Sequence, residues 1–74
     1  MKIIIRKAEH DYPGSNFHRV DLVLSDGAST PLFGVWREKD RAGTYYQSDT
    51  TAQTWKSLAA VKAYAEAVYI GVTP

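Results

Sequence analysis

The segment SLAAVKAYAEAVYI, residues Ser57 to Ile70, has a sustained helical period, and it decides the fold. At about 100° per residue, its apolar side chains fall on one stripe of a helix. That stripe comprises Leu58, Val61, Ala65, Val68 and Tyr69, with Trp55 and Tyr64 at its margins. Ser57 is a suitable N-cap, and Gly71 can end the helix in the left-handed conformation. The sequence therefore predicts a C-terminal helix whose apolar stripe must pack against another element.

The chain before the helix alternates apolar and polar residues with a period of two, which predicts an antiparallel sheet. The predicted strands are Lys2 to Lys7, Phe17 to Ser25, Leu32 to Lys39, and Thr44 to Ser48 with a short extension to Trp55. Pro13-Gly14 and Asp26-Gly27 mark turns, and Pro31 is expected to keep the third strand from starting before Leu32. The predicted fold class is α+β, a small antiparallel sheet of three to four strands packed against one C-terminal helix.

Size and composition predict a single small domain spanning residues 1–74. Nine Lys and Arg face eight Asp and Glu, so the net charge of +1 lacks the strong basic balance that dedicated nucleic-acid binders usually show. The chain has no cysteine, and no apolar run is long enough for a membrane span or a signal peptide. We therefore expect a cytoplasmic protein without disulfides.

Enzymatic chemistry is not predicted. The one cluster of potential metal ligands or acid-base groups contains His10 and His18, with Glu9, Asp11 and Asp21 nearby, and its spacing fits no recurring ligand pattern. No serine or threonine can be assigned a base, and the glycines are scattered singly rather than grouped in a phosphate-binding loop. The expectation is a non-enzymatic protein without a catalytic residue, metal, cofactor or small-molecule ligand.

The sheet face away from the helix is the first candidate binding surface. If alternation directs Ile3, Ile5, Val20, Leu22, Leu24, Phe33 and Val35 toward the helix, the opposite face carries Ile4, Arg6, Phe17, Arg19, Val23 and Trp36. Aromatic residues and arginine concentrate binding energy at interfaces. Trp36 and Phe17 are then the expected anchors, with Arg6 and Arg19 giving polar specificity. The alternative is that the third strand is oriented the other way and Trp36 belongs to the core.

Two further surfaces remain open. Arg37, Lys39 and Arg41, together with Tyr45 and Tyr46, form a basic and aromatic hairpin tip that either extends the partner-binding surface or is an ordinary solvated turn. The back of the helix carries small residues, which either allow a helix-to-helix dimer or simply fill the surface. These residues are Ala59, Ala60, Ala63 and Ala67.

From Phe33 to Tyr69, two aromatic-containing strands precede the TWKSL segment, residues 54–58, and a helix that contains Tyr64-Ala65. This pattern, over about half the chain, resembles the sheet-plus-helix DNA-binding arms at the amino end of phage-type tyrosine recombinases. The resemblance implies a sheet that enters the major groove, with Arg19, Arg37, Lys39 and Arg41 on phosphates.

Near-neutral charge favours a protein partner or a second copy of the chain as the first prediction, with DNA binding as the alternative. The small single-domain build also suits proteins of phages and mobile elements.

Overall fold

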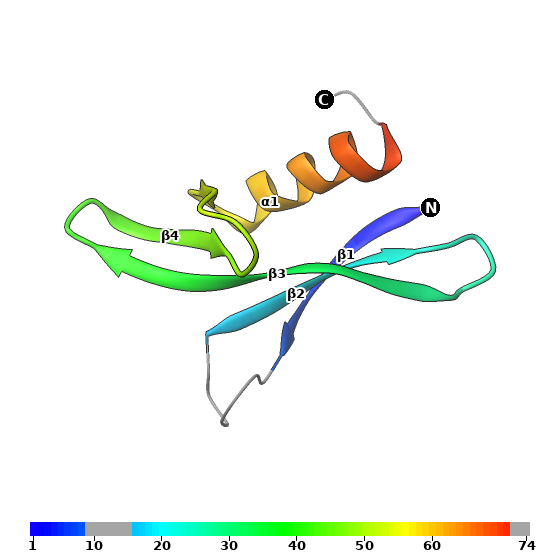
Figure 1. The fold of residues 1–74 in the computed structure, drawn as a ribbon, viewed down its shortest axis with the longest axis horizontal. Coiled ribbons are helices and arrows are strands. Elements are labelled where there is room, and N and C mark those ends of the chain that lie inside the picture. The colour runs from blue at the N-terminus through cyan, green and yellow to red at the C-terminus, as the bar shows by residue number, and fades with distance from the viewer. Residues whose placement is uncertain (9–15, 72–74) are drawn as a thin grey trace.

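The computed structural model describes residues 1–8 and 16–71 of the 74-residue chain. Its elements are β1 (Lys2–Ala8), β2 (Phe17–Val23), β3 (Ser29–Asp40), β4 (Gly43–Ser48), β5 (Thr54–Trp55), the helix α1 (Leu58–Ala65) and a π-helical turn η1 (Glu66–Ile70). The five strands form one antiparallel sheet in the order β1-β2-β3-β4-β5, with α1 along one face (Figure 1). The predicted α+β class is confirmed, although the sheet has five strands rather than three to four. The predicted Pro13-Gly14 turn lies outside the described residues.

The long central strand β3 pairs along its first half with β2 and along its second half with β4 (Figure 1). Leu32 is an extra residue on β3, because Val20 pairs with Phe33 while the next residue, Asp21, pairs with Pro31. Such a bulge is one of the few places where a sheet accepts proline. The prediction that Pro31 delays the start of the strand is therefore wrong, since β3 already includes the residues before it.

Both ends of the helix follow the predicted chemistry. The Ser57 side chain accepts a hydrogen bond from the Ala60 amide at 3.1 Å, which satisfies one of the free donors of the first turn. At the other end Gly71 adopts a left-handed conformation with φ of 85°. Its amide donates to the Glu66 carbonyl at 2.9 Å, five residues earlier in the chain. The predicted N-cap and C-terminal glycine are confirmed.

The π-helical turn changes which side chains the helix buries. A π turn spans more residues than an α turn, so the residues after it are rotated relative to the α-helical stripe. Val61 and Ala65 are fully buried, whereas Val68 is 54% exposed and Tyr69 43% exposed. Ile70 packs against the core instead. The prediction that Val68 and Tyr69 continue the buried stripe is wrong for this reason.

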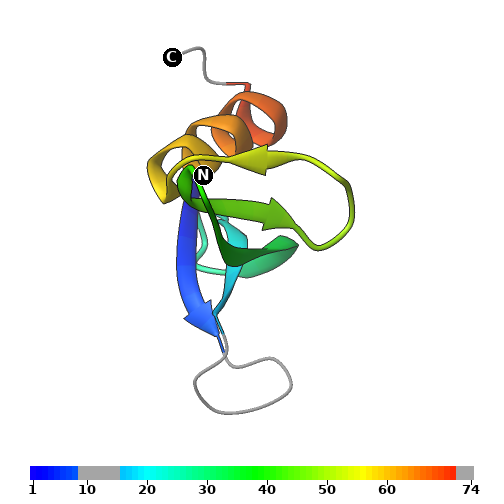
Figure 2. The same cartoon turned by 90° about the vertical axis from the view of Figure 1, so that its left-hand side faces the viewer.

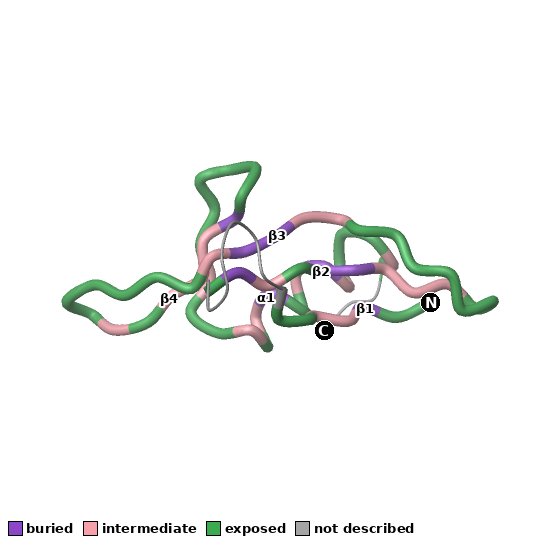
Figure 3. Tube along the Cα trace, turned by 90° about the horizontal axis from the view of Figure 1, so that it is seen from below, coloured by how far each residue is buried: buried purple, intermediate pink, exposed green. Residues whose placement is uncertain are grey.

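The core lies between α1 and the sheet. Its fully buried residues are Ile3, Val20, Val35, Val61 and Ala65. Partly buried apolar residues surround them, namely Ile5, Leu22, Leu32, Phe33, Tyr46, Trp55, Leu58 and Ile70. The sheet curves so that both edge strands, β1 and β5, contact α1 (Figure 2). Burial is therefore concentrated in the middle of β2, β3 and α1 (Figure 3).

The pairing register of β2 and β3 shows which face of β3 lies toward the helix. Val35 is buried in the core and pairs with His18, whereas Trp36 pairs with Phe17 on the opposite face. The predicted orientation of β3 is confirmed, and the alternative in which Trp36 is a core residue is not the one observed.

Candidate functional site

We call the sheet surface opposite α1 the outer face. In an antiparallel sheet, directly paired residues project from the same side. On β1, β2 and the middle of β3 the outer face is formed by Ile4, Arg6, Phe17, Arg19, Asp21, Val23, Gly34 and Trp36, and it continues toward β4 through Glu38, Tyr45 and Gln47. No helix or strand of residues 1–8 and 16–71 lies over it (Figure 2). The structure thus brings together four of the predicted binding residues, namely Arg6, Phe17, Arg19 and Trp36.

The outer face carries an aromatic pair, Phe17 and Trp36, and the Phe17 ring lies against Gly34. The Phe17 and Trp36 rings lie 4.8 Å apart, tilted by 58°, and Phe17 is buried whereas Trp36 is half-buried. Gly34 makes room for the Phe17 ring, because a Cβ at this position would overlap the Cζ and Cε1 atoms of Phe17. An aromatic ring over a glycine on the neighbouring strand also covers backbone that would otherwise be exposed. The Phe17 ring therefore contacts both Gly34 and the Trp36 ring.

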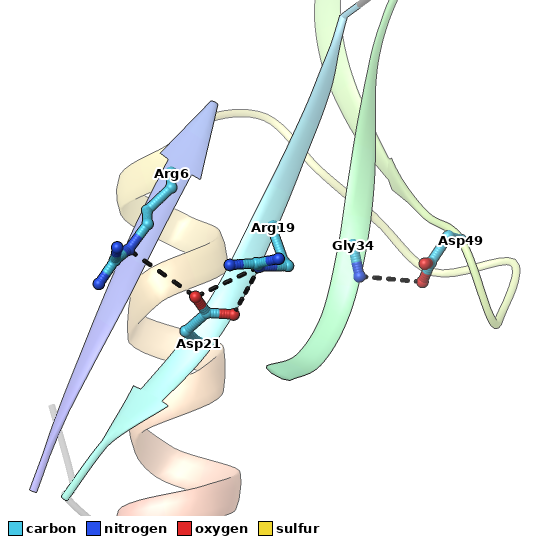
Figure 4. Close-up of polar contacts among 5 residues, drawn as sticks. All are labelled: Arg6, Arg19, Asp21, Gly34 and Asp49. Atoms are coloured by element: carbon cyan, nitrogen blue, oxygen red, sulfur yellow. Dashed lines mark hydrogen bonds and ion pairs between the residues drawn. The ribbon is translucent and has the colours of Figure 1, made fainter. Parts of the chain in front are cut away.

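Beside the aromatic pair, two arginines converge on one buried carboxylate (Figure 4). Arg19 donates through Nε to both oxygens of Asp21, at 3.0 and 3.3 Å, and the Nε of Arg6 lies 3.7 Å from Oδ2. The Asp21 side chain is only 2% exposed, whereas those of Arg6 and Arg19 are 53% and 51% exposed. Positive charge therefore faces the solvent, and the negative charge that orients it lies beneath.

A loop after β4 fixes the backbone under this surface. The Asp49 carboxylate accepts a hydrogen bond from the Gly34 amide at 3.0 Å (Figure 4). The Asp49 amide also donates to the Gly34 carbonyl at 2.9 Å. Asp49 thereby continues the β4 side of the ladder after the strand has ended. The loop is ordered further by the Ser48 hydroxyl, which accepts from the amides of Thr50 and Thr51.

The basic residues predicted at the hairpin tip do not extend the outer face. Arg37 pairs with Tyr46, and Tyr46 pairs with Trp55, so Arg37 and Tyr46 lie on the helix side of the sheet. Lys39 is two residues beyond Arg37 on the same strand and shares that side. Arg41 lies in the turn between β3 and β4. The predicted set is therefore divided between two faces and a turn.

His18 also lies on the helix side, where its ring meets Tyr46 edge-on at 5.9 Å. Burial, followed by the nearby positive charges of Lys7 and Arg37, lowers the pKa of His18 below its ordinary value of 6.5. Asp21 lies on the outer face, so the suggested grouping of His18 with Asp21 is not formed. The other members of that grouping, Glu9, His10 and Asp11, lie outside the described residues.

The part of the chain that the structure describes groups no three His, Asp or Glu side chains that could hold a metal ion. It also contains no helix with the length and hydropathy needed to cross a membrane. An open hollow of about 840 Å³ lies beside β4 and the start of α1, with Tyr45, Trp55 and Lys56 in its lining. On the helix, Ala59, Ala63 and Ala67 are exposed.

Comparison with protein-family models, curated proteins and solved structures found no match to this chain.

Three residues of this site were not predicted. Asp21 was grouped only with potential acid-base residues, and no part in the binding surface was predicted for Gly34 or Asp49. Asp21 lies two residues after Arg19 on β2, so the strand period already places both side chains on one face. The contact of Asp21 with Arg6 depends in addition on the β1–β2 register. The carboxylate of Asp49 replaces a backbone acceptor, which no periodicity could indicate.

Proposed function

We propose that this protein is a small, non-enzymatic binding module whose outer face takes an acidic, partly apolar segment of a partner protein. The observation that carries the proposal is the Phe17–Trp36 ring pair beside two half-exposed arginines that share the buried Asp21 carboxylate.

The aromatic pair is suited to anchor a partner. A half-buried tryptophan offers a large apolar surface that loses little conformational freedom on binding, because Phe17 already supports its ring. Ile4 and Val23 on the neighbouring strands add aliphatic surface on the same face. Such a centre favours a partner segment with an aromatic or aliphatic side chain.

The arginines are suited to carboxylates. Arg6 and Arg19 both contact the Asp21 carboxylate through their Nε atoms. No described residue accepts a hydrogen bond from the terminal guanidinium nitrogens of these two arginines. A guanidinium held at one edge can offer its other nitrogens in the fork geometry that carboxylates prefer. Because Asp21 holds Arg19 by hydrogen bonds and attracts Arg6 through an ion pair, less entropy is lost when the partner binds.

Charge also distinguishes the three candidate partners of the outer face, which are a second copy of the chain, a nucleic acid and another protein. A second copy of the chain would place the same exposed arginines opposite one another, which like-charge repulsion disfavours. A nucleic acid needs a continuous basic surface, whereas Arg19 and Arg37 lie on opposite faces of this sheet. An acidic protein segment complements the outer face without either difficulty.

A peptide-display selection from a random library against the intact protein tests the proposal. We expect selected peptides to be rich in Asp and Glu around an aromatic or aliphatic residue. Trp36→Ala should weaken binding of such a peptide by about 2 kcal/mol or more, which is roughly 30-fold. Arg19→Gln should weaken it and also reduce its salt dependence. The matched control, Arg41→Gln, removes the same charge away from the outer face and should leave the affinity unchanged.

Different results would assign the outer face differently. Selected peptides without acidic residues, or peptides that bind Trp36→Ala as well as the parent protein, would contradict the proposal. A dimer that forms with rising concentration and is lost in Trp36→Ala would assign the face to a second copy. Binding to duplex DNA with a steep salt dependence, lost in Arg19→Gln, would favour the DNA-binding alternative.

A further inference from the structure

A second cluster of charge lies on the other side of the sheet. Lys7, His18, Arg37 and Tyr46 project from β1, β2, β3 and β4 on the helix side, and we call them the basic cluster. Lys7 and Arg37 are exposed, so this end of the sheet lies beyond the part that α1 buries. The cluster therefore forms a surface separate from the outer face.

Strand pairing brings these four side chains close together. The Arg37 amide donates to the Asn16 carbonyl at 2.8 Å, which fixes the alternation of the ladder on both sides of β2 and β3. This alternation makes two of the pairs non-hydrogen-bonded, namely Lys7 with His18 and Arg37 with Tyr46. In such pairs the Cα atoms lie about 4.5 Å apart. The His18–Tyr46 ring contact at 5.9 Å joins the two pairs.

The cluster has an excess of positive charge. Among residues 1–8 and 16–71, neither Lys7 nor Arg37 forms an ion pair, since the acidic group in the ion pairs of this sheet, Asp21, lies on the outer face. Burial of the His18 ring lowers its pKa, and the positive charges of Lys7 and Arg37 lower it further, so both charges act at the ring. The Nδ1 atom of His18 is buried and has no hydrogen-bond partner among the described residues. Arg37 Nη2 donates to Asn16 Oδ1 at 3.3 Å. The other guanidinium nitrogens of Arg37 and the exposed ammonium of Lys7 leave donors and charge for an anion.

We propose that the basic cluster binds the dianionic phosphate group of a small phosphate monoester. A guanidinium can donate to two phosphate oxygens and an ammonium to a third, while protonation of His18 adds a third positive charge. Three basic groups on adjacent strands match one compact dianion. A nucleic-acid backbone would instead need basic residues in a row, and Arg6 and Arg19 on the far face cannot contribute to it. This site is independent of the proposed function of the outer face.

The test uses the intact protein and two probes, inorganic phosphate and sulfate, at constant ionic strength. Binding is followed by NMR at the His18 imidazole and at the amides of Lys7 and Arg37. Sulfate keeps its charge between pH 5 and 8, so any pH dependence of its affinity belongs to the protein. We expect saturable shifts for both ions, and a sulfate affinity that rises as the pH falls and His18 gains its proton.

Variants make the assignment specific. Arg37→Gln should weaken binding of both ions by about tenfold or more, as expected for the loss of hydrogen bonds to a charged group. Lys7→Gln should also weaken it, and both sites are exposed, so the fold should be retained. Lys62→Gln, which removes an exposed charge on α1, should change nothing. His18→Gln should abolish the pH dependence of sulfate binding.

The proposal is overturned by any of three results. The first is a shift that grows linearly with ion concentration without saturating. The second is undiminished phosphate binding in Arg37→Gln. The third is a short DNA duplex that displaces phosphate from the cluster more effectively than a sugar phosphate at equal phosphate concentration, which would assign the cluster to nucleic-acid backbone instead.

Discussion

Replacing Gly34 by alanine should damage the fold and the outer face together. The backbone of Gly34 does not require glycine, because its φ is not in the left-handed region where Gly27, Gly43 and Gly71 lie. The lack of space above Gly34 does require glycine, since a Cβ would overlap the far edge of the Phe17 ring and approach Asp49 Oδ2 to 2.9 Å. The ring would have to move, and Trp36 rests on it.

The size of the effect follows from three contributions. Forcing an extra methyl group into a packed site costs about 1–3 kcal/mol. Losing the Phe17–Trp36 ring contact adds about 0.5–1.5 kcal/mol. Alanine restricts the unfolded chain more than glycine and returns about 0.5–1 kcal/mol. The expected net loss is about 2 kcal/mol, against a total stability of about 4–11 kcal/mol for a domain of this length.

The assay is urea unfolding followed by far-ultraviolet circular dichroism, which does not depend on the Trp36 signal. Phe17→Leu provides the matched background, because leucine keeps apolar volume at the site but lacks the Cζ and Cε1 atoms that the new methyl group would meet. In that background Gly34→Ala should be neutral or slightly stabilising. The double-mutant cycle should then give a coupling energy of about 2 kcal/mol between the two positions.

Equal losses in both backgrounds would refute this reasoning. They would show that the penalty arises from the backbone or from Asp49 rather than from the Phe17 ring. A loss below about half a kilocalorie per mole in the parent protein, typical of a surface site, would show that the recess above Gly34 can expand freely.

Three further predictions concern the core, the helix-side histidine and the two tryptophans. Val61→Ala should cost about 1–3 kcal/mol because Val61 is fully buried, whereas Val68→Ala should change stability by no more than about 0.5 kcal/mol. Urea unfolding measures both, and similar losses would mean that the π turn does not rotate Val68 out of the core. The pKa of His18 is lower in the folded than in the unfolded protein, so the unfolded state binds more protons and stability should decrease as the pH falls through 6.5. Unfolding of the parent protein and His18→Gln between pH 5 and 8 should show this slope only in the parent. Trp55→Ala should cost about 2–3 kcal/mol because Trp55 packs on Phe33 and Tyr64, and Trp36→Ala only about 1 kcal/mol. The reverse order, measured by circular dichroism, would contradict the separation of core from outer face.

Much of the fold could be predicted because local patterns and tertiary packing agree over most of the chain. Alternation in β1 and β2 assigned Ile3 and Val20 to the core, and both are buried. The Ser57 cap and Gly71 followed from side-chain and backbone chemistry that acts within one helical turn. Where the cause is local, the sequence was sufficient.

The errors occurred where the period of an element changes. The bulge at Leu32 and the π turn after Ala65 each alter the regular repeat of side-chain directions, and neither has a residue signature that periodicity detects. Arg37 is a different case. Its alternation with Trp36 already placed the two on opposite faces, so grouping them in one binding surface disregarded the same pattern that correctly oriented β3.

The outer face is built in two layers, and this division explains how binding can change without loss of the fold. Phe17, Asp21 and Gly34 are buried, and each fixes a more exposed group or the strand beneath it. In the upper layer, Trp36 is half-buried, so its replacement removes contact surface at little cost in packing. Replacement of Arg19 has a further cost, because it removes the hydrogen-bond donor of the buried Asp21 carboxylate. Substitution of Trp36 should therefore alter mainly affinity or partner choice. Substitutions in the lower layer should change stability and binding together, because they release the groups that the upper layer presents.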